Sequence, residues 1–414
     1  MVDPAAFDFD VIVLGAGAAG LMAAIHAAER GRRVLLLEKG KKPGVKILMS
    51  GGTRCNITHD CDNRGIVEAF GPNGKFLHSA LANFGVRDTI NFFEAEGVAT
   101  KVEDTGKIFP VSDRALDVLN ALLRRLGRTT VKLTLNEPAR DVVPLPEGGF
   151  RVVTDQRSPT CQHVVVTTGG LSFPGCGTTG DGYGFTKKFG HTIVPTRPAL
   201  VPVTVQPTWI KELQGVTLPH IGLKVLDENK SLTARRGSTL FAHFGLTGPA
   251  PLDVSRAISG HATPTKLMLE VDLLPKVTEQ AFDEFLRTQT AANGKQLLAG
   301  VMSEMLTRRV CDQLLQLSEL PLDRRAAALS KVDRLKLVAA VKRLRLPVRG
   351  TLGYEKAEVT AGGVSLDEVD SRTMQSKRQP GLFLAGELLD LDGWIGGYNF
   401  QSAWSTGWLA GQNV

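Results

Sequence analysis

The hydrophobic pattern of residues 9–37 predicts a strand, a helix and a second strand in succession. Residues 9–14 are apolar and rich in β-branched side chains, residues 20–29 are rich in alanine, and residues 34–37 are again apolar. Gly31 stands where glycine commonly ends a helix. A buried strand, a glycine-rich turn, a helix and another buried strand are typical of a βαβ unit with parallel strands.

Beyond this unit the pattern changes along the chain. Strand-like stretches occur at residues 131–135, 150–154 and 163–168, and short strands punctuated by Pro and Gly follow them. Apolar side chains then repeat at i, i+3 and i+4 as far as Leu344, which predicts a series of helices.

Strand-like runs return at residues 357–360 and 381–385, ahead of a glycine-rich turn and a last predicted helix. We therefore expect an α/β protein whose Rossmann-like nucleotide-binding domain is interrupted by two inserts. The predicted domains are the nucleotide-binding domain at residues 1–190 and 351–414, a β-rich insert at 191–275 and a helical insert at 276–350.

Composition excludes several protein classes. With 414 residues, 43% hydrophobic and 22% charged, the chain can bury more than one core, so it is neither disordered nor collagen-like. Its five Cys are odd in number and form no C-x-x-C pair, which argues against disulfides and a structural zinc site. The uncharged run at residues 11–28 follows acidic residues and contains three glycines, so it is a poor signal peptide or membrane span. We expect a cytoplasmic protein without a metal.

The basic charge is concentrated in the helical insert. The whole chain has a net charge of +7, and residues 276–350 contain 14 Lys/Arg against 8 Asp/Glu. One interpretation is a solvated helical surface; the other is a docking surface for RNA phosphates, with Lys342, Arg343 and Arg345 as candidate contacts.

A dinucleotide fingerprint occupies the turn between the first strand and helix. Residues 15–20 read Gly-Ala-Gly-Ala-Ala-Gly, a spacing that permits a tight turn, close approach of a pyrophosphate, and close packing of helix on strand. An acid at the end of the second strand can accept hydrogen bonds from a ribose. A second run of this form, at residues 175–180, follows a proline rather than a strand and is interpreted as a loop. The predicted contacts here are Gly15, Gly17, Ala18, Ala19, Gly20, Glu38 and Lys39.

Two further strand ends favour FAD over NAD. The strand near residue 166 ends in Thr168, Gly169 and Gly170, and the strand near residue 384 ends in Gly386 and Glu387. Because the carboxyl ends of parallel strands meet at one edge of a sheet, they add small residues and an acid to the same site. An FAD that extends across the sheet needs these extra contacts.

Four motifs resemble signatures of the BaiN/RdsA family of bacterial flavoproteins, in the right order and nearly from end to end. They are residues 46–56, which end Ser-Gly-Gly-Thr-Arg-Cys-Asn, residues 241–249, residues 359–364 and residues 386–401. The departures are Thr53, where a third glycine is common, and Ala242, where threonine is common.

The resemblance implies an FAD-dependent enzyme that takes hydride from NAD(P)H and saturates an activated C=C bond. The implied substrate is a uridine of ribosomal RNA, which becomes dihydrouridine. One alternative is reduction or oxidation of a small conjugated carbonyl compound. Another is a non-enzymatic RNA-binding protein stabilised by flavin.

The motifs also provide candidate site residues. Arg54 could compensate pyrophosphate charge or polarise a substrate carbonyl, or simply form a surface ion pair. Cys55 and His243 are the candidate proton donors, with a small buried thiol and a structural histidine as the alternatives. The turn at Gly396 and Gly397 could present backbone N–H groups to the flavin. The remaining predicted cofactor contacts are Lys46, Gly51, Gly52, Asn56, Tyr398 and Asn399.

Overall fold

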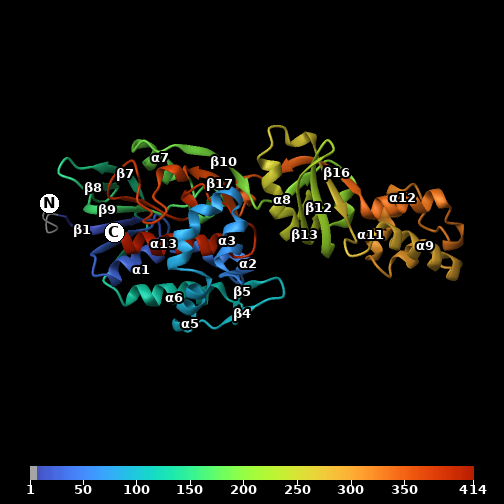
Figure 1. Cartoon of the computed structure of the whole chain (residues 1–414), viewed down its shortest axis with the longest axis horizontal. Coiled ribbons are helices and arrows are strands. Elements are labelled where there is room, and N and C mark those ends of the chain that lie inside the picture. The colour runs from blue at the N-terminus through green and yellow to red at the C-terminus, as the bar shows by residue number, and fades with distance from the viewer. Residues whose placement is uncertain (1–6) are drawn as a thin grey trace. The chain divides into compact units, whose positions relative to one another are not determined.

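The computed structural model describes residues 7–414, which form two compact units (Figure 1). Unit 1 consists of the residues up to Pro198 and of Glu358–Val414, and unit 2 consists of Ala199–Ala357. Each unit has a hydrophobic core of its own. The chain therefore leaves unit 1 after its first part, builds unit 2, and returns.

Unit 1 is built on a mixed sheet with strand order β6-β2-β1-β9-β8-β7, in which β18 also pairs with β9. The pairs β6·β2, β2·β1, β1·β9 and β9·β18 are parallel, and the hairpin β7·β8 is antiparallel. Residues 11–14 and 34–37 are apolar and buried, which suits the centre of a parallel sheet because both faces are covered. The strands are β1 (Phe9–Leu14), β2 (Val34–Leu37), β6 (Lys132–Thr134), β7 (Ala139–Pro144), β8 (Phe150–Thr154), β9 (Thr160–Val166) and β18 (Leu382–Leu384).

Helices α1 (Ala18–Glu29) and α13 (Tyr398–Asn413) pack against each other in unit 1 (Figure 1). Their backbones approach closely because α13 presents glycines at the contact. A Cβ on Gly407 would overlap the Ala19 carbonyl oxygen, and one on Gly411 would lie 2.6 Å from the Ala23 carbonyl oxygen. The α13 helix therefore fixes the position of α1.

Smaller elements complete unit 1. A three-stranded sheet has the order β3-β5-β4, and β10 pairs with β17 where the chain leaves and re-enters the unit. These strands are β3 (Thr58–His59), β4 (Thr100–Val102), β5 (Lys107–Pro110), β10 (Ile193–Ala199) and β17 (Val359–Val364). The other α-helices are α2 (Val45–Thr53), α3 (Asn63–Ala69), α4 (His78–Asn83), α5 (Val86–Ala95), α6 (Ala115–Gly127) and α7 (Asp181–Lys188).

Unit 2 contains a closed antiparallel barrel with strand order β11-β14-β13-β12-β15-β16. Four helices form between β15 and β16 and share one core with the barrel (Figure 1). The strands are β11 (Val203–Val205), β12 (Thr217–Asp227), β13 (Lys230–Ala242), β14 (Gly245–Thr247), β15 (Leu267–Asp272) and β16 (Leu344–Thr351). The helices are α8 (Pro249–Ser259), α9 (Glu279–Ala292), α10 (Leu298–Met302), α11 (Arg308–Leu317) and α12 (Lys331–Lys342).

The predicted fold class is confirmed: a Rossmann-type domain carries an inserted β region and an inserted helical region. One local prediction was wrong. The helical repeat was extended to Leu344, but α12 ends at Lys342 and Leu344 begins β16. Leu344, Leu346 and Val348 are buried and alternate with exposed Arg345, so this segment has the period of a strand.

None of the helices formed by residues 7–414 has the length and hydropathy needed to cross a membrane.

Candidate functional site

The glycine turn between β1 and α1 leaves the N-terminus of α1 bare. Gly15 has φ +100°, and a Cβ on it would lie 2.9 Å from the Thr167 carbonyl oxygen; a Cβ on Gly20 would overlap the Gly15 carbonyl oxygen. Gly17 is the N-cap residue of α1 and makes no side-chain cap, and a Cβ placed on it would meet no atom within 4 Å. An anion can therefore approach the first-turn N–H groups and the positive end of the helix dipole.

Glu38 and Lys39 follow β2 beside this turn. The Glu38 carboxylate accepts hydrogen bonds from the backbone N–H groups of Ala16 (2.9 Å) and Gly40 (2.7 Å), so the acid touches the fingerprint itself. The Lys39 ammonium group donates to Asp181 Oδ2 at 2.5 Å and to the Thr179 hydroxyl. Lys39 thus ties the end of β2 to the start of α7.

The loop predicted at residues 175–180 begins with the end of the 3₁₀-helix η3 (Pro174–Cys176) and ends at the N-cap of α7. Its contact with Lys39 was not predicted. Gly180, with φ +76°, precedes α7, and Asp181 lies in the first turn of that helix. A glycine followed by an acid at a helix start is a local signal that could have drawn attention to Thr179 and Asp181.

The ends of β9 and β18 meet a lysine from α2. Glu387 Oε2 forms an ion pair with Lys46, and Glu387 Oε1 accepts a hydrogen bond from the Thr360 backbone N–H at 3.0 Å. A Cβ on Gly170 would overlap the Thr360 hydroxyl and lie 3.2 Å from Glu387 Oε1. The structure thus brings Gly170, Lys46 and Glu387 together, with Thr360 as a member that the sequence analysis missed.

Thr168 and Gly169 lie between β9 and this cluster. A Cβ on Gly182 of α7 would overlap the Thr168 hydroxyl, which is buried and makes no hydrogen bond to the described residues. Gly169 has φ +71° and lies beside Thr178, whose Cγ2 would be 3.0 Å from an added Cβ. Both residues line the contact between the strand end and α7.

Arg54 is held by two carboxylates near the β4–β5 hairpin. Its Nη1 lies 2.6 Å from Glu103 Oε1 and 3.4 Å from Asp113 Oδ1, and its guanidinium stacks 4.0 Å from the Phe109 ring centroid. The hydrogen bond to Glu103 and the two negative charges raise the pKa of Arg54. The geometry fits the ion-pair alternative, because Glu103 and Asp113 already compensate the charge of Arg54. These ion pairs attach residues 50–56 to the hairpin.

Cys55 is fully enclosed in the core of unit 1, with no exposed surface. Burial raises the pKa of its thiol to about 12, so the thiol is protonated at neutral pH. A proton donor also has to reach its substrate. The enclosed position of Cys55 therefore fits the role of a small buried residue better than the role of a proton donor.

Asn56 joins the same loop to the turn before α13. In the orientation that satisfies both ends of its amide, the side chain donates to the Thr58 carbonyl (2.9 Å) and accepts from the Gly397 N–H (3.1 Å). Gly51 and Gly52, with φ +56° and +68°, shape the preceding bend. The Gly397 N–H is therefore bound by Asn56, so the predicted presentation of this N–H to the flavin is wrong for Gly397.

Gly396 and Gly397 form the entry to α13, with φ +127° and +96°. Gly397 is the N-cap residue and has no side-chain cap, and a Cβ there would overlap the Thr58 backbone. The Asn399 side chain bonds to the backbone of Gly393 and Trp394, so it braces the preceding loop. Tyr398 is buried, and its ring stacks on the ring of His59, the second residue of β3.

His243 lies in unit 2, whereas the other candidate residues lie in unit 1. It is exposed in the two-residue turn between β13 and β14, with its ring 5.1 Å from the Phe244 ring. Unlike Cys55, it is on a surface that a substrate can reach.

The residues of unit 1 fit an extended dinucleotide. Helices α1 and α13 both begin at a glycine N-cap without a side-chain cap. Gly407 packs on Ala19 near the start of α1. The N-cap residue of α13, Gly397, precedes Gly407 by ten residues, so it lies about 15 Å from this contact along the axis of α13. Two helix N-termini without a side-chain cap and two acids, Glu38 and Glu387, could hold the pyrophosphate, ribose and flavin ends of FAD.

The family model described as HI0933-like protein Rossmann domain matches residues 9–413. The chain belongs to the HI0933-like family. The ribosomal RNA dihydrouridine synthase of Escherichia coli (strain K12) is 38% identical over 409 residues, which cover 98% of each chain. The 3-dehydro-bile acid delta(4,6)-reductase of Clostridium scindens is 32% identical over 412 residues, which cover 97% of each.

A solved structure shares the fold of this HI0933-like protein. The 3-ketosteroid-delta4-(5alpha)-dehydrogenase of Rhodococcus jostii RHA1, in complex with 4-androstene-3,17-dione, has a TM-score of 0.54 at 15% identity and covers 98% of this chain and 97% of that chain. The motif resemblance to the BaiN/RdsA family is confirmed, and the chain is an FAD-dependent oxidoreductase. Within residues 7–414 no group of three or more His, Cys, Asp or Glu side chains could hold a metal ion.

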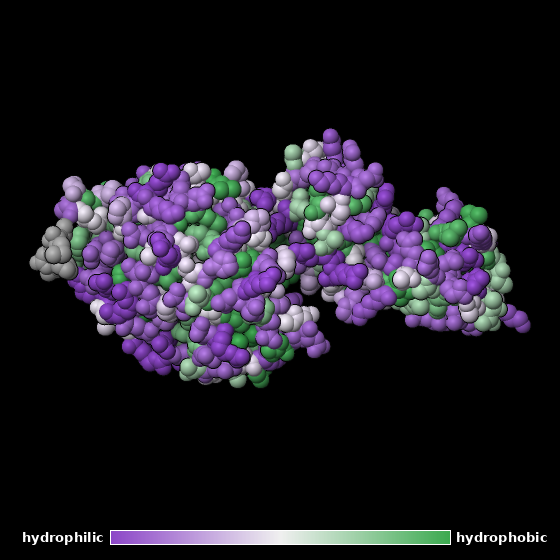
Figure 2. Space-filling model, viewed as in Figure 1, coloured by the Kyte–Doolittle hydropathy of each residue, from purple (hydrophilic) through white to green (hydrophobic). Residues whose placement is uncertain are grey.

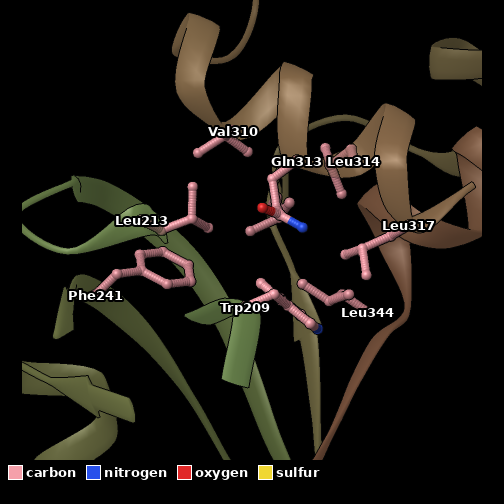
Figure 3. Close-up of a pocket in the computed structure, with 9 residues that line it drawn as sticks. Trp209, Leu213, Phe241, Val310, Gln313, Leu314, Leu317 and Leu344 are labelled. Atoms are coloured by element: carbon pink, nitrogen blue, oxygen red, sulfur yellow. The ribbon is translucent and has the colours of Figure 1, made fainter. Parts of the chain in front are cut away.

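A small apolar pocket in unit 2 lies between the barrel and α11 (Figure 3). Trp209 and Leu213 of the 3₁₀-helix η4 (Thr208–Leu213) face Leu314 and Leu317 of α11, and the Gln313 amide points into the space between them. The centre of a water-sized molecule can occupy only about 10 Å³ of it, which is room for about one water and not for a small-molecule ligand. It is a packing gap of unit 2 rather than a substrate site.

Proposed function

We propose that this HI0933-like oxidoreductase uses FAD and NAD(P)H to reduce a uridine of ribosomal RNA to dihydrouridine. The supporting observation is the match to a ribosomal RNA dihydrouridine synthase along 98% of both chains at 38% identity, against 32% for the bile-acid reductase. Uracil and a dienone are both conjugated carbonyl compounds, so one flavin site serves either class.

The residues of unit 1 have distinct roles in this proposal. FAD supplies hydride transfer between nicotinamide and substrate. The bare N-terminus of α1 at Gly17 binds the pyrophosphate, Glu38 the adenosine ribose, and Glu387 the ribityl chain. The N-terminus of α13, which follows the glycine pair, would bind the pyrimidine edge of the flavin. His243 is the candidate proton donor, because it is exposed whereas Cys55 is enclosed.

The charge distribution supports an RNA substrate. Unit 2 contains 22 Lys/Arg and 15 Asp/Glu, whereas unit 1 contains 27 of each, so unit 2 carries the whole net charge. Hydrophilic residues cover most of the face of unit 2 that Figure 2 shows. A unit with a basic excess is suited to binding phosphates without reading sequence.

The structure changes which basic residues of the helical insert are candidate phosphate contacts. Lys342 is buried, with its ammonium group 2.7 Å from Asp272 Oδ1 and donating to the Leu274 and Val277 carbonyls. Arg343 and Arg345 form ion pairs with Glu279 and Glu270. The expectation that these three residues dock RNA is therefore wrong for Lys342 and weakened for the other two, because carboxylates compensate their charges.

Several other basic residues of the insert form no ion pair within the described part of the chain, and we call three of these the basic tip: Lys295, Arg325 and Lys331. The Arg325 guanidinium donates to the Lys295 carbonyl at 2.6 Å, so these two residues are neighbours. Lys331 is exposed at the first turn of α12. We propose that this tip makes phosphate contacts.

Dihydrouridine in ribosomal RNA provides the test. Deletion of the gene is expected to remove one dihydrouridine from the 23S rRNA, as measured by nucleoside mass spectrometry, and the parent gene should restore it. A variant with Glu38→Lys, which places a cation where the ribose binds, should not restore it. Unchanged dihydrouridine in the deletion strain would overturn the proposal.

The bile-acid reductase supports a second candidate, a small enone substrate. To separate the two, the enzyme is reduced anaerobically with NADPH and then mixed with either an rRNA fragment or a steroid dienone. Reoxidation of the flavin by the dienone alone would favour the second candidate.

A further inference from the structure

The segment around β3 is fixed on the start of α13 by buried hydrogen bonds. The Trp404 Nε1 group donates to the Ile57 carbonyl at 2.9 Å, and the Thr58 hydroxyl donates to Gln401 Oε1 at 2.6 Å. Trp404 and Gln401 both belong to the first two turns of α13. The residue that follows Thr58 therefore has a fixed position relative to the glycine entry of this helix.

That residue is His59, and its ring is restrained on three sides. Nδ1 lies 2.9 Å from the Gly396 carbonyl oxygen, and because a carbonyl only accepts, Nδ1 carries the proton. The ring stacks on Tyr398 with centroids 4.5 Å apart and planes at 21°. On the Nε2 side, a Cβ on Gly106 would lie 2.7 Å from Nε2. The imidazole is thus confined between the β4–β5 turn and α13.

The glycine pair that His59 contacts cannot fix its own conformation. Gly396 and Gly397 have positive φ and no side chains, so many backbone conformations are open to them when nothing else restrains them. Asn56 holds the N–H of Gly397, and His59 holds the carbonyl of Gly396. This carbonyl and this N–H belong to the same peptide group, so Asn56 and His59 together fix the orientation of the peptide that joins the two glycines.

We infer that His59 is a positioning residue for the flavin end of the site, holding the Gly396 carbonyl so that the N–H groups at the start of α13 keep one orientation. The inference rests on the proposed binding of the flavin pyrimidine edge at this turn. Oriented N–H groups and a helix N-terminus favour negative charge, so they stabilise the reduced flavin more than the oxidised one. His59 therefore acts on the reduction potential through the backbone and does not touch the substrate.

Asparagine and leucine make a matched pair of substitutions. In His59→Asn, the side-chain Nδ2 occupies the place of imidazole Nδ1 and can still donate to Gly396, whereas His59→Leu fills similar space without a donor. We expect His59→Leu to bind FAD about tenfold more weakly and His59→Asn to stay near the parent. If the loss is confined to the reduced form, a tenfold change is a shift of about 30 mV to more negative potential for a two-electron couple.

Three measurements complete the test: FAD affinity by equilibrium dialysis, the midpoint potential of the bound flavin, and urea unfolding of the apoprotein. If His59→Leu does not fold, His59→Gln replaces it, because its amide reaches the Nε2 position and leaves Gly396 without a donor. The inference is overturned if His59→Leu, or His59→Gln in its place, keeps the FAD affinity and the midpoint potential of the parent. It is also overturned if His59→Asn loses as much affinity as the variant without a donor. A parent protein that binds no FAD would instead overturn the cofactor assignment in the proposed function and this inference with it.

Discussion

Thr53 has a backbone conformation that suits glycine better than a β-branched residue. Its φ is +71°, in the left-handed region, and its side chain is exposed. Such a conformation costs a non-glycine residue of order 1 kcal/mol or more. Thr53→Gly is therefore expected to raise the free energy of unfolding by about 1 kcal/mol, measured by urea denaturation. Thr53→Ala keeps the Cβ and should gain much less; a loss of stability with glycine would contradict the strain.

His26 makes the stability of unit 1 sensitive to acid. It lies in α1 with 6% of its surface exposed, near the rings of Phe84, Phe92 and Trp408. Burial lowers its pKa from 6.5 to about 4. Between these two values the unfolded chain binds the proton and the folded chain does not, so stability falls as the pH is lowered from 6.5 to 4.

Over the whole interval from pH 6.5 to pH 4, this proton uptake lowers the free energy of unfolding by about 3 kcal/mol at most. His26→Leu is expected to remove this part of the pH dependence, measured by urea unfolding at pH 7, 5 and 4. Equal losses for the parent and the variant over this range would show that other groups are responsible.

The residues of the site that could be predicted are those with local signals. The strand–turn–helix pattern at the start of the chain predicted Gly15, Gly17 and Glu38 as site residues, and the position of Glu387 directly after a predicted strand indicated that residue. The partners of Arg54 could not be predicted in this way. Glu103 and Asp113 reach it only because β5 pairs with both β3 and β4, and nothing in the local sequence around Arg54 indicates that pairing.

At the scale of elements, the contact between α1 and α13 depends on glycine. A Cβ on Gly407 would overlap the Ala19 carbonyl oxygen, which is backbone and cannot move aside without shifting α1. Gly407→Ala is expected to lower the free energy of unfolding by about 1–3 kcal/mol and to reduce FAD content, because the fingerprint is attached to α1. Thermal unfolding and the flavin absorbance of the purified protein measure both effects.

Gly184 provides the control for this substitution. It is exposed in α7, and a Cβ there would meet no atom within 4 Å. Gly184→Ala should therefore stabilise by up to about 1 kcal/mol through helix propensity. Similar behaviour of the two variants would mean that the close contact of the helices is unimportant.

The inserts show what a local pattern omits at the scale of elements. Short strands with Pro and Gly were predicted for the region before the helices, but closure of the barrel was not. Closure depends on β16, which pairs with both β11 and β15 although four helices separate it from β15. Pairing between segments so distant in sequence leaves no periodic signal, and the alternation that identifies β16 directly follows the helical repeat.

At the scale of the whole molecule, the separation of charge between the units predicts how salt affects RNA binding. Log affinity should fall linearly with log salt concentration, with a slope of about −0.7 for each phosphate contacted on single-stranded RNA. Replacing Lys295, Arg325 and Lys331 of the basic tip by glutamine should reduce the magnitude of the slope by up to about 2. Binding of an rRNA fragment at several salt concentrations measures this slope.

Arg343 and Arg345 provide the control pair, because Glu279 and Glu270 already compensate their charges. Replacing both by glutamine should change the slope less than replacing the basic tip, and FAD content should stay unchanged in both variants. If only the control pair lowers the slope, phosphates contact the barrel side of unit 2 rather than its tip.

The insertion of unit 2 within unit 1 also determines the order in which partners become available during synthesis. Strand β9 pairs with β1, which precedes it, and with β18, which a ribosome makes only after the whole of unit 2. Until then an apolar strand edge and the α1 face that contacts Gly407 lack native partners, while unit 2 already has every residue of its own core. The nascent chain therefore passes through a stage in which a complete barrel is joined to an unfinished sheet. Aggregation competes most strongly with folding at that stage, and chaperones have most to protect.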